Sequence, residues 1–228
     1  AAACMAVATA VGAQAPANRA DPAKVLRVAI PIAETGFDPQ ASQDFYSNTI
    51  NSAIFDPLYE YDYLVRPHKV VPRVAEALPE ISADGTTWKI RIRKGIHFAD
   101  DPAFKGGKRE LTAHDFVYAM KRLVDPKMRS PNVFMLRGRL VGIDDAIAKA
   151  KPSGRLDYDA EIEGVRALDR YTLQLKLVEP DYAFLDALTA TQTAPVAREV
   201  IEAYGDASGW AMANPVGTGP FRLKEWRR

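Results

Sequence analysis

The residues that could perform catalysis lack the spacing that catalysis needs. His68, His97 and His114 lie far apart, with no His-x-x-x-His pair and no carboxylate at metal-ligand spacing. No Gly-x-Ser-x-Gly elbow occurs, and the single cysteine, Cys4, belongs to a leading apolar segment. The segment 217–220, Gly-Thr-Gly-Pro, cannot lead directly into a helix, so it is not a dinucleotide-binding motif. The sequence therefore predicts that the protein is not an enzyme, and nothing in it requires a metal, nucleotide or organic cofactor.

The composition is that of a globular protein with balanced charge. Of 228 residues, 47% are apolar and 26% are charged, which argues against a disordered or low-complexity chain. The 30 Lys and Arg residues against 29 Asp and Glu residues give a formal net charge of +1. Because proteins that bind nucleic acid usually show a clear basic excess, we expect no nucleic-acid partner. The length allows one large domain or two small ones.

The leading segment resembles the apolar part of a secretory signal peptide. Residues 1–17 carry no charge, and a small-x-small cleavage site occurs at 13–15 or 15–17. A buried N-terminal helix is the alternative interpretation. Because the apolar run continues beyond Cys4, we expect no lipid anchor at that residue. We therefore expect a periplasmic protein, with a signal-peptide remnant over 1–17 and a linker over 18–24.

Apolar periodicity predicts the elements that must position any binding residues. Thr112 and Asp115 have capping-box spacing before the clearest helix, and Phe45, Tyr46 and Ile50 lie on one apolar face of another. Helices and strands mix without regular βαβ alternation, so we expect a mixed α+β fold. We expect strands over 25–30, 58–61, 64–65, 87–93, 172–177 and from 221 onward, and helices over 44–58, 112–124, after 179–181 and between 195 and 205.

Five segments carry a resemblance to a known family. The most specific is SADGTTWKIRIRKGIHF at 82–98, followed by LTAHDFVYA at 111–119 with Arg122 and the Asp-Pro at 125–126. The others are IFDPLYEY at 54–61, PRVAEALP at 72–79 and GTGPF at 217–221. In this order they resemble the extracytoplasmic solute-binding proteins of ABC importers, family 5, the oligopeptide- and dipeptide-binding type.

The resemblance implies a two-lobed α/β fold of the periplasmic-binding-protein type II class. Such a protein encloses a solute between its lobes and delivers it to a permease in the cytoplasmic membrane. Residues 25–228 are then expected to form most of lobe I, with the chain ending before lobe II. The implied partners are a peptide-like or similar polar solute and the permease, and the protein is expected to be a monomer.

The resemblance also implies where the solute lies. The loop with Thr35, Gly36 and Phe37 follows the first expected strand and is expected at the cleft edge. Relatives that hold peptides carry an aromatic residue directly after the Ser-Pro of segment 130–131. Here Asn132 stands there, and Phe134 follows two residues later; packing of Phe134 in the apolar run 133–136 is the alternative. The remaining candidate ligand-binding residues are Trp210, Asn214, Gly217, Thr218 and Gly219.

Two other functions remain open from the sequence. One is a secreted hydrolase whose catalytic residues lie beyond residue 228, which a nucleophile motif in further sequence would favour. The other is the ligand-sensing lobe of a signalling receptor, which a transmembrane segment followed by a signalling domain would favour.

Overall fold

The computed structural model describes residues 24–205 and 213–227, in two units that divide after Pro31. Residues 24–31, the described part of the first unit, form neither helix nor strand and are exposed, Leu26 by 85%. The prediction of a buried strand over 25–30 is therefore wrong. A strand needs a partner for its backbone N–H and C=O groups, and no ladder to this segment forms among the described residues.

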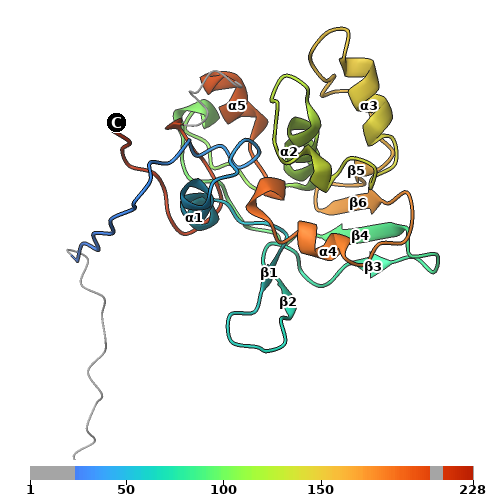
Figure 1. Ribbon diagram of the computed structural model, residues 1–228, viewed down its shortest axis with the longest axis horizontal. Coiled ribbons are helices and arrows are strands. Elements are labelled where there is room, and N and C mark those ends of the chain that lie inside the picture. Colours follow the sequence, from blue (N-terminus) through green and yellow to red (C-terminus); the bar gives the residue numbers. More distant parts are fainter. Residues whose placement is uncertain (1–23, 206–212, 228) are drawn as a thin grey trace, which may run out of the picture. The chain divides into compact units, whose positions relative to one another are not determined.

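The second unit contains a four-stranded antiparallel sheet, seen at the lower right of Figure 1. The strand predictions over 87–93 and 172–177 are confirmed, because Trp88 and Ile90 alternate with exposed residues and pair with Leu175 and Leu173. The strands lie in the order β3 (Glu80–Ile81), β4 (Thr87–Arg91), β6 (Thr172–Lys176) and β5 (Val165–Ala167).

Helix α2 (Ala113–Val124) packs against β5 and β6. The predicted capping box is present: the backbone N–H and hydroxyl of Thr112 donate to Asp115 Oδ2 at 2.7 and 2.9 Å. Phe116 and Met120 are fully buried on the face that meets the sheet. A further helix, α3 (Ile143–Ala150), was not predicted from the sequence.

Helix α1 (Phe45–Ile54) forms within the expected range 44–58, but it ends before Phe55, which is extended, and it buries a different face. Phe45 is 75% exposed, whereas Ser47, Asn51 and Ile54 form the buried row. The reason is the surface that the helix meets. Asn51 donates to the Ser42 hydroxyl at 3.1 Å, so the helix packs on a polar loop rather than on an apolar sheet.

The segment after α1 is a hairpin that projects from the body of the second unit (Figure 1). Its strands are β1 (Tyr59–Tyr61) and β2 (Val70–Pro72), in register from Tyr59 opposite Pro72 to Tyr61 opposite Val70. The expected strand at 64–65 is instead part of the connecting loop 62–69.

The described residues after β6 include two α-helices, the 3-10 helix η3 (Thr191–Thr193) between them, and an extended tail. Helix α4 (Phe184–Ala187) is shorter than the pattern after 179–181 suggested, and helix α5 (Arg198–Tyr204) ends at Gly205 as predicted. The strand expected from residue 221 does not form. Among the described residues this tail has no ladder partner, and Phe221 contributes a single backbone bond, from its N–H to Ala53 O at 3.2 Å.

The different burial of two phenylalanines makes the packing testable. Phe116→Ala should lower the free energy of unfolding by about 3–5 kcal/mol, because the side chain fills the core between α2 and the sheet. Phe45→Ala, the matched control, should change it by less than about 0.5 kcal/mol. Chemical denaturation monitored by circular dichroism measures both, and similar losses would contradict the assignment of the buried face of α1.

Candidate ligand-facing site

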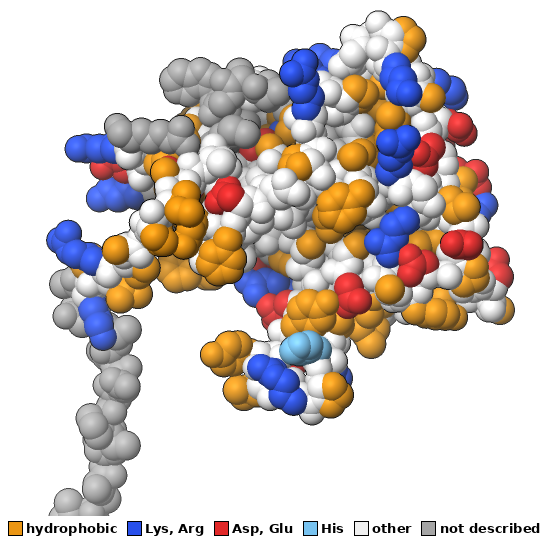
Figure 2. Space-filling view, viewed as in Figure 1, with side chains coloured by type: hydrophobic (Ala, Val, Ile, Leu, Met, Phe, Trp, Pro, Cys, Tyr) orange, Lys and Arg blue, Asp and Glu red, His pale blue; other side chains and the backbone are white. Residues whose placement is uncertain are grey.

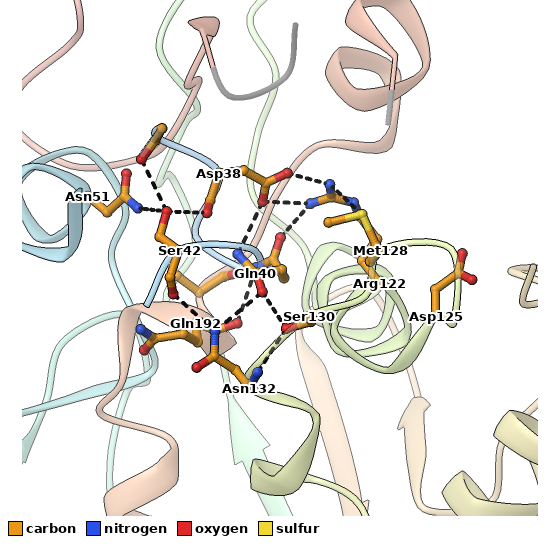
Figure 3. Close-up of polar contacts among 12 residues, drawn as sticks. Asp38, Gln40, Ser42, Asn51, Arg122, Asp125, Met128, Ser130, Asn132 and Gln192 are labelled. Carbon is orange, nitrogen blue, oxygen red and sulfur yellow. Dashed lines mark hydrogen bonds and ion pairs between the residues drawn. The ribbon is translucent and has the colours of Figure 1, made fainter. Parts of the chain in front are cut away.

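A buried ion pair fixes the loop that contains the first candidate residues (Figure 3). Arg122, fully buried on α2, donates to both carboxylate oxygens of Asp38 at 2.6 and 3.2 Å and to Gln40 Oε1 at 2.6 Å. A buried guanidinium destabilises a fold unless it is paired in this way. Loop 36–42 therefore has one defined position against α2.

A second set of hydrogen bonds ties the same loop to two others (Figure 3). Ser130 Oγ donates to the Gln40 carbonyl at 2.6 Å, and Asn132 Nδ2 donates to the Ser42 carbonyl at 3.0 Å. Gln40 Nε2 donates to the Ala194 carbonyl at 3.1 Å. We call the joined side chains Asp38, Gln40, Ser42, Arg122, Ser130 and Asn132 the polar network; all are buried.

The N-terminal end of α1 holds Thr35 in place. Thr35 Oγ1 donates to Asp44 Oδ2 at 2.6 Å, and the Ser47 N–H donates to Asp44 Oδ1 at 2.8 Å. Burial acts to raise the pKa of Asp44, but these hydrogen bonds from Ser47 and Thr35 outweigh it and lower that pKa to about 2. The ionised carboxylate is therefore part of the folded structure that positions Thr35.

The C-terminal end of α1 holds the Gly-Thr-Gly segment. The Gly219 N–H donates to Ile54 O at 2.8 Å, and Thr218 Oγ1 donates to Asp56 Oδ2 at 2.9 Å. A Cβ on Gly217 would overlap the Ile54 carbonyl oxygen, so only glycine allows this approach. A Cβ on Gly219 would likewise overlap the Ala53 and Ile54 carbonyl oxygens, so both glycines have a packing role against the end of α1.

The candidate residues differ in how much of each can meet a solute. Phe134 is 66% exposed in the 3-10 helix η2 (Val133–Met135). The alternative interpretation, in which Phe134 packs within the apolar run 133–136, is therefore wrong. Asn132 is buried, and its amide is used inside the polar network. Trp210 lies outside the described residues. Of the others, Thr35 is exposed, Asn214, Thr218 and Gly219 are half-buried, and Gly36, Phe37 and Gly217 are buried.

Phe37 connects the two ends of this region. Its ring packs edge-on against Trp226 with centroids 5.1 Å apart, and the Trp226 indole N–H donates to Glu34. Phe37 and Asn214 also line a narrow cavity of about 10 Å³, which has room for one water molecule at most. Phe37 therefore acts as a packing residue beneath the exposed surface. Of the described candidate residues, Thr35 and Phe134 are the exposed ones, and Asn214, Thr218 and Gly219 are partly accessible.

The sequence contains one further signal for the polar network. Asp115, Ala119 and Arg122 recur at i, i+4 and i+7 on α2, which places two charged residues beside its apolar face. Charged side chains on a buried face require partners, and Asp115 does pair with Arg109 at 2.6 Å. The sequence could not identify Asp38 as the partner of Arg122, because 84 residues separate the two.

The described residues carry neither the side-chain clusters of a metal site nor a membrane span. In the ranges 24–205 and 213–227, no three His, Cys, Asp or Glu side chains come together as metal ligands. No helix in these ranges has the length and apolar composition to cross a bilayer. The arrangement offers rigid backbone, hydrogen-bonding groups and an exposed aromatic ring, which are the means of non-covalent recognition.

Fold and sequence together define the class and the family. The second unit has the fold of a lobe of an extracellular solute-binding protein. The chain superimposes on OppA of Burkholderia pseudomallei with a TM-score of 0.68 at 29% identity, covering 87% of this chain and 35% of that one. Residues 69–228 match the bacterial extracellular solute-binding proteins, family 5 (middle region). The chain belongs to this family.

Its relatives include two proteins with named peptide ligands. The periplasmic oligopeptide-binding protein OppA of Salmonella typhimurium is 32% identical over 191 residues, which cover 83% of this chain and 31% of that protein. The dipeptide-binding protein of Escherichia coli is 28% identical over 202 residues, covering 85% and 34%. This chain thus spans about a third of the length of these relatives.

Removing one partner of the buried ion pair tests the role of the polar network. Arg122→Met should lower the free energy of unfolding by about 3–5 kcal/mol, because it leaves the Asp38 carboxylate buried without its cation. Arg137→Met breaks the exposed pair with Asp144 and should cost less than about 1 kcal/mol. Urea titrations of both variants measure these changes in the free energy of unfolding. If Arg122→Met costs no more than the control, the network does not hold the loops.

The Asp44 carboxylate predicts a pH-dependent stability. Its folded-state pKa of about 2 lies below the ordinary value of 3.8, so its ionisation favours folding above pH 4. That contribution should disappear as the pH falls from about 4 to 2. Asn still caps the helix, so the melting temperatures of the original protein and Asp44→Asn should converge over this range. Asp145→Asn on α3 controls for charge removal, and a constant difference between original and Asp44→Asn would refute the prediction.

Proposed function

We propose that the protein is the solute-binding receptor of an ABC importer, which captures a peptide or similar polar solute outside the cytoplasmic membrane. The observation that carries this proposal is the combined likeness, in sequence and fold, to OppA over most of the chain. The receptor changes no bond in its solute. It supplies a binding surface that a second lobe completes, and the closed form delivers the solute to the permease.

The described lobe suits this role because its solute-facing side is held rigid. The polar network and both ends of α1 fix the loops that carry Thr35 and Phe134. A surface that is ordered before binding loses little conformational entropy when the solute arrives. Phe134 supplies an exposed flat apolar group, and the neighbouring loop backbone supplies hydrogen-bonding groups of the kind that an extended peptide requires.

Location and partners follow from the same proposal. The relative OppA of Salmonella typhimurium is a periplasmic protein. We propose the same compartment for this protein, reached through a cleaved signal peptide over residues 1–17, without lipid attachment at Cys4. Its partners would be one small peptide-like solute and a permease in the cytoplasmic membrane, and it would act as a monomer that needs no cofactor.

Native mass spectrometry of the protein isolated from the cell envelope tests the function. The expected result is a non-covalent adduct that leaves on denaturation and whose fragmentation yields a series of amino-acid masses. A sugar or other non-peptide adduct would identify that molecule as the solute in place of a peptide. The proposed role as a receptor would stand. Absence of any adduct, together with no binding of added peptides, would overturn the proposal.

A variant of the exposed aromatic ring tests the site separately from the function. Phe134→Ala should weaken binding of the co-purified solute by about tenfold, because a contact surface of about one aromatic ring is lost. Tyr182→Ala removes an equally exposed aromatic side chain outside the candidate site and should leave affinity unchanged. Isothermal titration calorimetry of the protein stripped of its solute compares them. Equal affinities for both variants would remove Phe134 from the site.

A further inference from the structure

The loop of the β1–β2 hairpin exposes large apolar side chains to solvent. Tyr63 and Leu64 are 88% and 82% exposed, and Val65 beside them is also exposed. In Figure 2 the hairpin stands apart from the body, with hydrophobic side chains on both flanks and cationic side chains between them. Contiguous exposed apolar groups of this kind mark an interaction surface.

Hydrogen bonds within the loop hold these side chains outward. Asp62 Oδ1 accepts from the N–H groups of Leu64 and Val65 at 2.9 and 3.1 Å, and the Asp62 N–H donates to Lys69 O at 2.8 Å. Arg66 Nη1 donates to the Tyr63 and Val65 carbonyls at 3.2 and 2.9 Å. The loop is therefore an ordered turn. Its backbone hydrogen bonds are made within the loop, and its apolar side chains stay exposed.

The loop carries a net positive charge, because Arg66 and Lys69 outnumber Asp62. Arg66, His68 and Lys69 follow the apolar residues, and Asp62 is the single acidic residue of segment 62–69. One oxygen of Asp62 is already used to hold the turn. The Lys69 side chain is exposed and makes no hydrogen bond or ion pair within the described residues. The tip therefore combines apolar insertion groups with a cationic rim.

The base of the hairpin fixes its direction. Arg73 next to β2 pairs with Asp56 at 2.6 Å and with Glu60 of β1. Tyr61 OH donates to Asp186 Oδ1 at 2.8 Å, which joins the end of β1 to helix α4. These contacts use the acidic groups near the base, so the free charge at the tip is cationic.

We propose that the hairpin tip, formed by residues 62–69, docks on an anionic lipid surface. Tyr63 and Leu64 enter the boundary between headgroups and acyl chains, where an aromatic ring with a polar end is favoured. Arg66 and Lys69 contact the phosphate groups of the lipids, and their long alkyl stems allow the charge to stay at that level. The rim of cations favours a lipid headgroup layer over an apolar protein groove, which would leave those charges unpaired.

Leu64→Trp tests insertion at the tip itself. With vesicles of equal parts phosphatidylglycerol and phosphatidylcholine, the emission of the introduced indole should shift to shorter wavelength and be quenched by brominated lipid chains. Leu78→Trp, at another exposed leucine, should show neither change. The spectrum of the unaltered protein is subtracted to remove its own tryptophans. Because the probe reports the tip alone, attachment of the leading segment to vesicles does not mimic the result.

Lys69→Gln tests the charge contribution. It should weaken binding to the same vesicles about fivefold, whereas Lys149→Gln, at an exposed lysine of α3, should not weaken it. Vesicles of phosphatidylcholine alone should bind weakly, and added salt should reduce binding to the anionic ones.

Three results would overturn the proposal. The first is an emission of the Leu64→Trp probe that anionic vesicles leave unchanged. The second is an emission already at short wavelength without lipid, which means that protein covers the tip. If that short-wavelength emission depends on protein concentration, the occupant is a second copy. The third is binding that responds equally to Lys69→Gln and Lys149→Gln. None of these results bears on whether the protein binds a peptide, so the proposed function stands or falls separately.

Discussion

The ion pair between Arg122 and Asp38 is the constraint on which the candidate ligand-facing site depends. Both groups are buried, so the carboxylate and the guanidinium each require the other. Loop 36–42 must therefore meet α2 in one register, and once it does so, Gln40 and Ser42 present their carbonyls to Ser130 and Asn132. A single charge on a helix thus determines where two loops lie.

Helix α1 connects the two halves of the candidate site. Its first turn holds Thr35 through Asp44, and its last turn receives Gly219 through the Ile54 carbonyl. The segments before α1 and near the C-terminus are far apart in sequence, yet α1 contacts both of them and fixes the distance between them. Its buried row is polar where it meets loop 36–42 because the loop, not a sheet, is its packing partner.

Elements that local sequence determines were predictable, and elements that need a distant partner were not. The alternation in β4 and β6 and the capping box of α2 are complete within a few residues, and all three form as expected. The segments 25–30 and 221–227 show strand-like patterns, but a pattern does not supply the partner strand. Among site residues, the exposure of Phe134 and the partner of Arg122 depend on contacts that no local pattern encodes.

The distance in sequence between the members of the polar network also sets an order of events. Asp38 and Gln40 leave the ribosome early, Arg122 follows 84 residues after Asp38, and the Ala194 carbonyl that Gln40 uses comes 154 residues after it. Loop 36–42 cannot complete its hydrogen bonds to distant residues until nearly the whole described chain has been made, because the contact of Gln40 with Ala194 closes so large a loop. A chain that passes through a membrane channel in an unfolded state gains from this delay. In a chain of that kind, the contact from Gln40 Nε2 to the Ala194 carbonyl would be completed only after translocation.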